Sequence, residues 1–199
     1  MPKDTFFNLS EDKKKKIYGA AVKEFSAKRL SEASINSIVK EAGIPRGSFY
    51  QYFSGKEDVY AYMASVIAKE QAVVERFLAQ PAAGAGAFDG LLHKARAALE
   101  LYRVRPEYRR VALLAQGSAQ LFGQSSFADE IESISELLER DKLRGIIRED
   151  ADASLAAEMA YSLVTNECLK EGQDKDEALR RISGIIAMIM QGITARGLS

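Results

Sequence analysis

The chain has 199 residues, 47% of them hydrophobic, with 28 Lys and Arg matched by 28 Asp and Glu, one His and one Cys. This length and apolar content predict one or two folded domains with a real hydrophobic core, and they exclude a disordered chain. A single cysteine excludes an internal disulfide, and one Cys with one His leaves little for a metal site or a Cys–His or Ser–His–Asp centre, so we expect no enzyme and no cofactor.

The first predicted elements are two helices. Ser10 can cap the first helix, and an apolar stripe at helical spacing runs from Ile17 to Phe25. A short second helix begins at Ser34 and ends at Gly43, because glycine just past a helix takes a left-handed conformation at little cost. Strand alternation is absent, which indicates an all-α fold.

A turn and two more helices follow. Pro45 pushes Ile44 into an extended conformation, so the chain turns here before a third short helix over about residues 46–53. Ser54 and Glu57 have the spacing of a capping box, which opens a long fourth helix to about residue 78.

The remainder of the chain is also predicted to be helical, giving about nine helices in all. Five further helices are expected at about residues 88–104, 106–123, 126–144, 153–170 and 175–196. The most apolar stretch, residues 182–193, is too short for a bilayer span of about 20 residues. Residues 1–16 lack the apolar core of a secretory signal, so we expect a cytoplasmic protein with no membrane partner.

Residues 34–53 have the pattern of a helix-turn-helix, whose second helix lies in the major groove of DNA. Phe49 and Phe53 are four residues apart and share the inward face of that helix. The remaining side chains suit DNA, because Arg pairs with guanine or phosphate, Gln with adenine, and Gly lets the backbone approach closely. These outward residues are Arg46, Gly47, Ser48, Tyr50 and Gln51, with Tyr52 on the flank.

The charge distribution is consistent with an anionic partner for this segment. Residues 1–60 carry 11 Lys and Arg against 8 Asp and Glu, whereas the rest of the chain has a net negative charge. A basic module on an acidic body favours an anionic partner for the module. The run Lys13–Lys16 covers more than one helical turn, so its four side chains cannot all face DNA.

Several of these residues together resemble the DNA-binding domain of the TetR family of bacterial transcriptional regulators. The similar segments are Ala42-Gly43-Ile44, Gly47-Ser48-Phe49-Tyr50, Tyr52-Phe53 and Lys56, within a match over about residues 10–60. The resemblance implies a helix-turn-helix domain over residues 1–54 and a helical effector-binding and dimerisation domain over residues 55–199. It implies contacts to double-stranded operator DNA from Ser34, Asn36, Arg46, Gly47, Ser48, Tyr50, Gln51, Tyr52 and Lys56.

Three positions depart from the family pattern. Arg29 stands where the family usually has a glycine that ends the first helix, so we expect a non-glycine residue in a left-handed conformation there. Val39 is larger than the usual residue, and Pro45 replaces the usual hydroxyl cap of the third helix.

A helix-turn-helix is expected to act as a homodimer, because a second copy raises its affinity and lets it read a two-fold site. The last two helices are expected to form the seam between subunits, because a helix that is apolar nearly all round must be covered on several sides. The expected interface residues are Met159, Leu163, Ile185, Ile186, Met188, Ile189 and Ile193. A purely intramolecular core is the alternative explanation for these apolar faces.

A small-molecule effector is the last partner that the resemblance implies, and its binding would release a repressor from DNA. Aromatic, amide and charged residues on the surrounding helices suit a largely apolar ligand. The candidates are Tyr102, Tyr108, Arg109, Gln116, Gln120, Phe122, Tyr161 and Asn166, with His93 and Glu167 as further options and Cys168 as the candidate for a thiol sensor.

Two other classes of function stay open. An enzyme could be built on an all-helical body, and tight chemistry around His93 would favour that class. A protein-interaction module could have kept a helix-turn-helix without DNA binding, and weak, salt-insensitive DNA binding would favour this class. The outward face with Arg46, Tyr50 and Gln51 argues against the second alternative.

Overall fold

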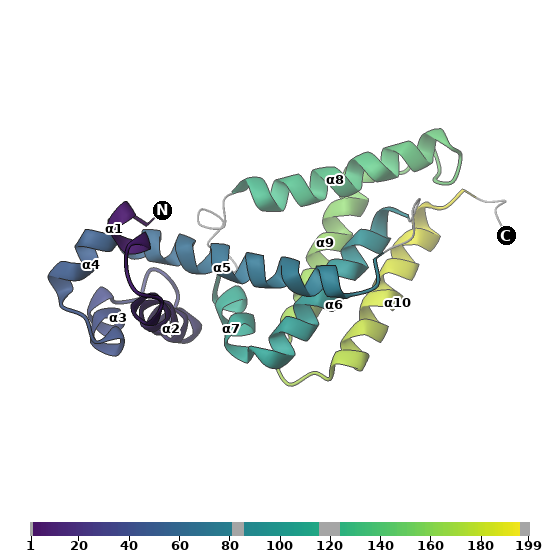
Figure 1. The fold of residues 1–199 in the computed structure, drawn as a ribbon. Helices are drawn as coiled ribbons and strands as arrows, with labels where there is room; N and C mark the ends of the chain where they lie inside the picture. The colour runs from purple at the N-terminus through teal and green to yellow at the C-terminus, as the bar shows by residue number, and fades with distance from the viewer. Residues whose placement is uncertain (1, 81–85, 116–123, 196–199) are drawn as a thin grey trace. The chain divides into compact units, whose positions relative to one another are not determined.

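The computed structural model describes residues 2–80, 86–115 and 124–195, and every regular element in these ranges is an α-helix (Figure 1). The prediction of an all-α fold is therefore confirmed for the described chain. Within the described ranges the helices are α1 (Asp4–Phe7), α2 (Glu11–Ala27), α3 (Ile35–Ala42), α4 (Arg46–Tyr52), α5 (Lys56–Phe77), α6 (Ala87–Val104), α7 (Pro106–Ala115), α8 (Gln124–Leu143), α9 (Ala153–Leu169) and α10 (Lys175–Ile193). No helix in these ranges is long and apolar enough to cross a membrane.

The chain divides into two compact units. The first unit contains residues 1–71 and 104–123, and the second contains residues 72–103 and 124–199. The predicted division of function between residues 54 and 55 stays a prediction. In the first unit, the ring centres of Tyr60 of α5 and Phe25 of α2 lie 4.9 Å apart, and α7 packs directly against α2.

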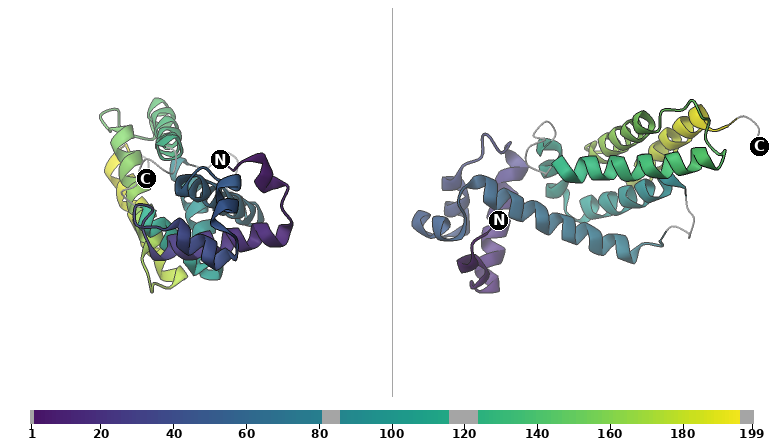
Figure 2. Two further views of the ribbon diagram at one scale, coloured as in Figure 1. Left: turned by 90° about the vertical axis from the view of Figure 1, so that its left-hand side faces the viewer. Right: turned by 90° about the horizontal axis from the view of Figure 1, so that it is seen from above.

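In the first unit, α2 packs against α3 and α7, and α1 packs against α4. Figure 2 gives two further views of the helices. The apolar stripe of α2 is buried as its spacing predicts, with Ile17, Ala21 and Phe25 at most 1% exposed. Phe49 and Phe53 are fully buried in the same core. Removal of each such side chain from water contributes about 1.5–3 kcal/mol, which fixes α4 on this scaffold.

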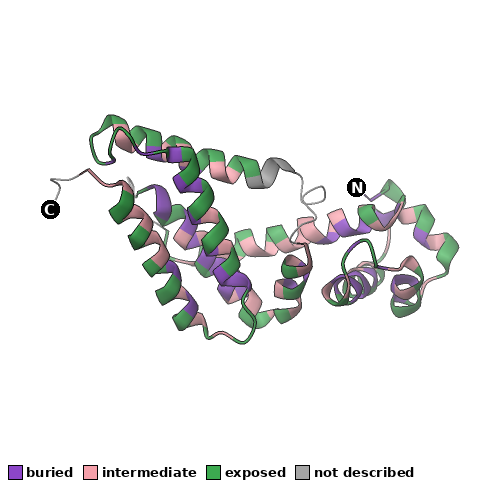
Figure 3. Ribbon diagram, turned by 180° about the vertical axis from the view of Figure 1, so that it is seen from behind, coloured by how far each residue is buried: buried purple, intermediate pink, exposed green. Residues whose placement is uncertain are grey.

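In the second unit, α9 packs between α8 and α10. Alanines at helical spacing form its buried face, which lets neighbouring helices approach closely; they are Ala153, Ala156, Ala157 and Ala160. Leu138 of α8 and Ile182 of α10 are fully buried in the same core cluster. Figure 3 colours the buried, half-buried and exposed residues along these helices.

Local geometry confirms one expectation and corrects two. Gly43 ends α3 with φ of 66°, as predicted. Arg29 is not left-handed, because α2 ends at Ala27 through an extended Lys28 with φ of −139°, and no described non-glycine residue has a positive φ. The predicted capping-box contact of Ser54 goes to Asp58 rather than Glu57: the Ser54 amide donates to Asp58 Oδ2 at 3.0 Å, because α5 begins at Lys56.

Candidate nucleic-acid interface

A buried carboxylate of α2 fixes the start of α3. Glu24 Oε1 accepts the Ser34 amide at 2.9 Å and the Lys28 ammonium at 2.9 Å, and its side chain is 10% exposed. Ser34 precedes α3 in an extended conformation, and its own hydroxyl makes no capping bond. Glu24 thus accepts the amide of the residue that precedes α3. In this way a side chain of α2 supplies the acceptor that a capping side chain of α3 would otherwise supply.

The turn between α3 and α4 depends on Gly43. The Ile44 amide donates to the Val39 carbonyl at 3.1 Å across the left-handed glycine, which is the hydrogen bond of a Schellman motif. Pro45 then leads into α4 with φ of −63° and provides no side-chain cap. This tight turn sets the direction in which α4 leaves α3.

The outward face of α4 carries the side chains that the sequence predicts. Arg46, Gly47 and Gln51 are exposed, and Tyr50 is 40% exposed. Ser48 and Tyr52 are half-buried. Phe49 and Phe53 lie below, so the helix presents a polar surface over an aromatic core.

Arg46 joins the two helices of the motif on this surface. Its guanidinium donates to Asn36 Oδ1 near the start of α3 and to the Tyr50 hydroxyl at 3.1 Å. The same group lies 5.7 Å from the centre of the Tyr50 ring, at cation–π distance. Arginine has five N–H donors, so these contacts orient Arg46 and leave donors for a base or a phosphate.

Lys56 has a structural role in addition to its predicted one. Its ammonium donates to the Ser31 carbonyl at 2.8 Å and to the Ala33 carbonyl at 3.3 Å. These bonds hold the loop that leads into α3. A lysine ammonium has three donors, so one remains for the phosphate contact that the sequence predicts.

Helix α1 was missed by the sequence reasoning, although it contacts α4. Phe6 of this helix is 1% exposed, and its ring centre lies 5.0 Å from that of Phe53 and 4.8 Å from that of Tyr62. The one feature of the sequence that could have indicated this packing is the adjacent pair Phe6-Phe7 in a polar segment. A four-residue helix is too short for periodicity to detect.

Two of the predicted effector residues lie in the first unit. Tyr108 is 1% exposed, and its hydroxyl donates to Glu70 Oε2 at 3.0 Å. Burial is the main cause that raises the pKa of Tyr108 to about 12. Arg109 is half-buried on the same helix. Gln116, Gln120 and Phe122 lie outside the described residues.

The other predicted effector residues lie in the second unit. Tyr102 and Tyr161 are half-buried and pack against its core, whereas Asn166 is exposed. His93 is buried with its Nε2 atom 3.1 Å from the Glu75 carbonyl oxygen, and Cys168 is 6% exposed. Their role in ligand binding stays a prediction.

Glu167 holds the ends of α9 and α10 together. Burial opposes its ionisation, but hydrogen bonds from Lys170, Gln173 and Arg181 outweigh that effect and hold its pKa below the usual range. The bonds from Gln173 and Arg181 are 2.7 and 2.6 Å long. These contacts give Glu167 a structural role within the bundle.

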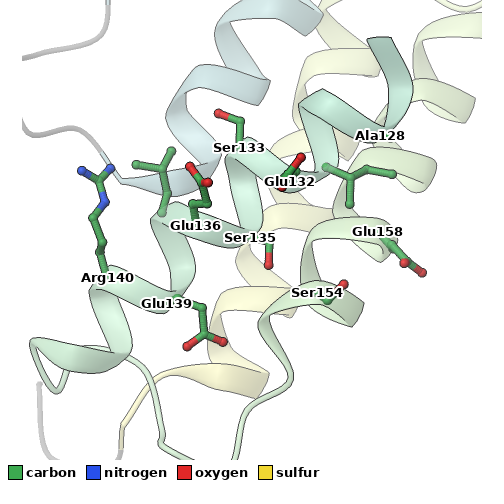
Figure 4. Close-up of a pocket in the computed structure, with 11 residues that line it drawn as sticks. Ala128, Glu132, Ser133, Ser135, Glu136, Glu139, Arg140, Ser154 and Glu158 are labelled. Atoms are coloured by element: carbon green, nitrogen blue, oxygen red, sulfur yellow. The ribbon is translucent and has the colours of Figure 1, made fainter. Parts of the chain in front are cut away.

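A groove of about 1000 Å³ lies between α8 and α9 in the second unit (Figure 4). Carboxylates dominate its polar lining, which consists of Glu132, Glu136, Glu139, Glu158, Arg140 and three serines. No predicted effector residue lines this groove, and its acidity does not suit a largely apolar ligand. Across the described chain, no three His, Cys, Asp or Glu side chains gather in a way that could hold a metal ion.

The predicted dimer residues form a partly exposed apolar face. Leu155, Met159 and Leu163 follow at four-residue spacing along α9 and are 52%, 46% and 43% exposed. Met188 of α10 is 67% exposed. Ile185 is half-buried, and Ile186, Ile189 and Ile193 are half-buried against the core of the same unit.

Comparison with known proteins agrees with this geometry. Residues 17–63 match the family model described as bacterial regulatory proteins of the tetR family. Over 56 residues the chain is 48% identical to an HTH-type transcriptional regulator of Bacillus subtilis, YvdT, whose own function is uncharacterised. That match covers 28% of this chain and 26% of the relative, so the chain spans about a quarter of the length of this curated relative.

Solved structures extend the likeness to the fold of the whole chain. A TetR-family regulator from Chloroflexus aurantiacus has a TM-score of 0.72 at 24% identity, over 98% of this chain and 100% of that one. The flavonoid-responsive regulator FrrA has a TM-score of 0.56 at 25% identity, over 94% of this chain and 100% of that one. The first likeness shows the fold alone.

Proposed function

Because the chain belongs to the TetR family of bacterial regulatory proteins, we propose that it is a homodimeric, sequence-specific DNA-binding transcriptional regulator of the bacterial cytoplasm, and not an enzyme. One observation carries this proposal. The segment that matches the family model presents Arg46, Tyr50 and Gln51 outward from a helix whose other face is buried. Such a surface suits the major groove.

The residues of the proposed DNA-reading surface would make two kinds of contact. Arg46, Gly47, Ser48 and Gln51 would lie in the groove, where Arg recognises guanine and Gln recognises adenine. Ser34, Tyr50, Tyr52 and Lys56 would contact phosphates, and Asn36 would contact a phosphate or a base edge. Phosphate contacts set the position of the protein, and base contacts set its sequence choice.

A second copy of this chain is the proposed occupant of the apolar face on α9 and α10. The exposed side chains Leu155, Met159, Leu163 and Met188 would be covered in a four-helix seam. Two-fold symmetry would then place two α4 helices on half-sites about 34–36 Å apart, one turn of the duplex. The operator would be a two-fold-symmetric sequence.

We propose further that the protein is a repressor, and that a small, largely apolar ligand releases it from its operator. FrrA, which this chain resembles at 25% identity, is described as flavonoid-responsive, and a flavonoid is an aromatic molecule of this kind. Ligand binding would change the spacing of the two DNA-reading helices. The candidates of the second unit are Tyr102, Tyr161 and Asn166.

Arg46→Ala tests the DNA-reading surface, and Arg96→Ala is the matched control because Arg96 is an exposed arginine of α6. The fluorescence anisotropy of labelled duplexes gives the Kd on a sequence selected from random DNA and on a scrambled one. The unaltered protein is expected to prefer the selected sequence by about 10³-fold or more. Arg46→Ala should lose most of this preference, and Arg96→Ala should keep it. Equal, salt-insensitive binding of both duplexes by the unaltered protein would favour an interaction module instead.

A further inference from the structure

The last carbonyl groups of α4 have no hydrogen-bond donor within the helix. It has seven residues, no side-chain N-cap, no acidic residue in its first turn and no basic residue in its last turn. Its last internal bond runs from the Phe53 amide to the Phe49 carbonyl at 2.9 Å. The carbonyl groups of Tyr50, Gln51 and Tyr52 therefore lie beyond the reach of intrahelical donors.

The segment before α2 supplies a donor to each of these three carbonyl groups. The Lys3 ammonium donates to the Tyr50 carbonyl at 2.8 Å, and the Lys3 amide donates to the Tyr52 carbonyl at 2.8 Å. The Thr5 hydroxyl donates to the Gln51 carbonyl. The helix end is thus capped by a segment more than 40 positions away in the sequence.

Phe6 anchors these donors. Its ring is buried against Phe53 and Tyr62, and its amide donates to the Lys3 carbonyl at 2.9 Å, which closes the turn that carries Lys3 and Thr5. The aromatic contact fixes the backbone of the segment, so the capping groups are already in place before any DNA is bound.

We propose that residues 3–6 form a clamp that positions the C-terminal half of α4 for DNA reading, with Lys3 and Thr5 as positioning residues. This inference rests on the proposed function. Tyr50 and Gln51, whose carbonyl groups the clamp holds, are also the outward residues expected at DNA. A helix of two turns is marginal without outside support, so loss of the clamp frays the turn that directs Gln51 into the groove. The Lys3 ammonium also complements the negative end of the helix dipole.

Two pairs of variants test the clamp. Lys3→Met keeps the length of the side chain and removes its donor, whereas Lys3→Arg restores a cationic donor. Thr5→Val keeps the shape and removes the hydroxyl, whereas Thr5→Ser restores it. Lys69→Met is the matched control, because Lys69 is an exposed lysine of α5. All of these changes lie at exposed positions, so the fold is expected to survive, and circular dichroism checks that it does.

The first readout is amide hydrogen exchange in the protein without DNA. Lys3→Met and Thr5→Val should each speed the exchange of the amides of residues 51–53 by about tenfold, because these amides belong to the turn that frays. Lys3→Arg, Thr5→Ser and Lys69→Met should exchange at nearly the original rate. Unchanged exchange in both Lys3→Met and Thr5→Val would overturn the clamp, whatever the protein binds.

The second readout is the Kd on a selected duplex and on a scrambled duplex over a series of salt concentrations. The clamp predicts that Lys3→Met weakens specific binding about tenfold, with the salt slope unchanged and the affinity recovered in Lys3→Arg. A uniform loss on both duplexes with a slope lower by about one would instead make Lys3 a phosphate contact and overturn its positioning role. Absence of any sequence preference in the unaltered protein would refute the proposed function, and the exchange experiment would still decide the clamp.

Discussion

The hydroxyl oxygens of Tyr18 and Tyr108 lie 2.7 Å apart and share a hydrogen bond that joins α2 to α7. Tyr108 also donates to Glu70 of α5, and the Arg105 guanidinium lies 4.5 Å from the centre of the Tyr108 ring. The pKa values of Tyr18 and Tyr108 are both raised, mainly because the two side chains are buried. Both phenols therefore stay neutral at physiological pH. Three helices of the first unit are therefore linked through one polar network.

Removal of either hydroxyl is expected to destabilise this unit. Tyr18→Phe, which loses one hydrogen bond, should lower the free energy of unfolding by about 0.5–1.5 kcal/mol, and Tyr108→Phe, which loses two, should lower it by about 1–3 kcal/mol. The double variant should cost less than the two single variants together by about 0.5 kcal/mol or more, because the groups are direct partners. Urea unfolding of the four proteins measures this cycle, and strict additivity would show that the two hydroxyls act independently.

Gln51 is predicted to read a base. Gln51→Ala should cost about 1–3 kcal/mol of binding free energy at one base position and leave other positions unaffected. The measurement is the Kd on a set of operator duplexes, each with one base pair changed. A loss of equal size on every duplex would remove Gln51 from the groove.

Lys56 is predicted to contact a phosphate with the donor that its two carbonyl partners leave over. Lys56→Ala should weaken binding uniformly across sequences and lower the salt slope by about one. It should also lower the free energy of unfolding by about 1 kcal/mol, because the Ser31 and Ala33 carbonyl groups lose their donor. An unaltered salt slope with reduced stability would leave Lys56 only its structural role.

The apolar face of α9 is predicted to hold the dimer together. Leu163→Glu should convert the protein to a monomer at micromolar concentration, because it would bury a carboxylate in an apolar seam. Phe77→Glu is the matched control, since Phe77 is an exposed apolar residue of α5 at 87% exposure. Size-exclusion chromatography with light scattering gives the mass of each variant. A monomer in the unaltered protein, or a dimer in Leu163→Glu, would contradict the proposed seam.

Glu100 is predicted to make the second unit sensitive to acid. Hydrogen bonds from Arg103 and Lys175 lower its pKa from 4.5 to about 2. A carboxyl whose pKa is lower in the folded state stabilises the protein above its unfolded pKa, and the stabilisation fades as the pH falls through the folded pKa. Glu100→Gln should therefore reduce the free energy of unfolding at pH 7 and make little difference near pH 2.

Urea unfolding at pH 7, 5, 4 and 3 follows this loss, with Glu149→Gln as the matched control because Glu149 is an exposed carboxylate of the same unit. The gap between Glu100→Gln and the unaltered protein should narrow steadily below about pH 4.5. A constant gap over the whole range would mean that the Glu100 side chain contributes by packing and not by charge.

Local patterns in the sequence were sufficient for most of the fold. The helical spacing of Ile17, Ala21 and Phe25 and the glycine at position 43 depend on neighbours within a few residues, and both expectations are confirmed. The helices of the second unit follow from the same helical spacing of apolar residues. The burial of Phe49 and Phe53 follows from their spacing within one short helix.

Features that depend on distant partners could not be predicted in this way. The bond from the Ser34 amide to Glu24 and the bonds from Lys3 and Thr5 to α4 join residues that no periodicity relates. Arg29 shows the limit of a family pattern, because an extended Lys28 ends α2 without any left-handed residue. The effector residues were predicted from residue type and from the helices that carry them, and neither says which side chains share a pocket.

Selection of genomic DNA fragments by the purified protein at near-physiological salt tests the central claim most directly. If α4 reads DNA as part of a homodimer, the recovered fragments should share a two-fold-symmetric sequence whose half-sites are one helical turn apart. Recovery of fragments without a common sequence, both with and without candidate apolar ligands, would contradict a specific dimeric DNA reader.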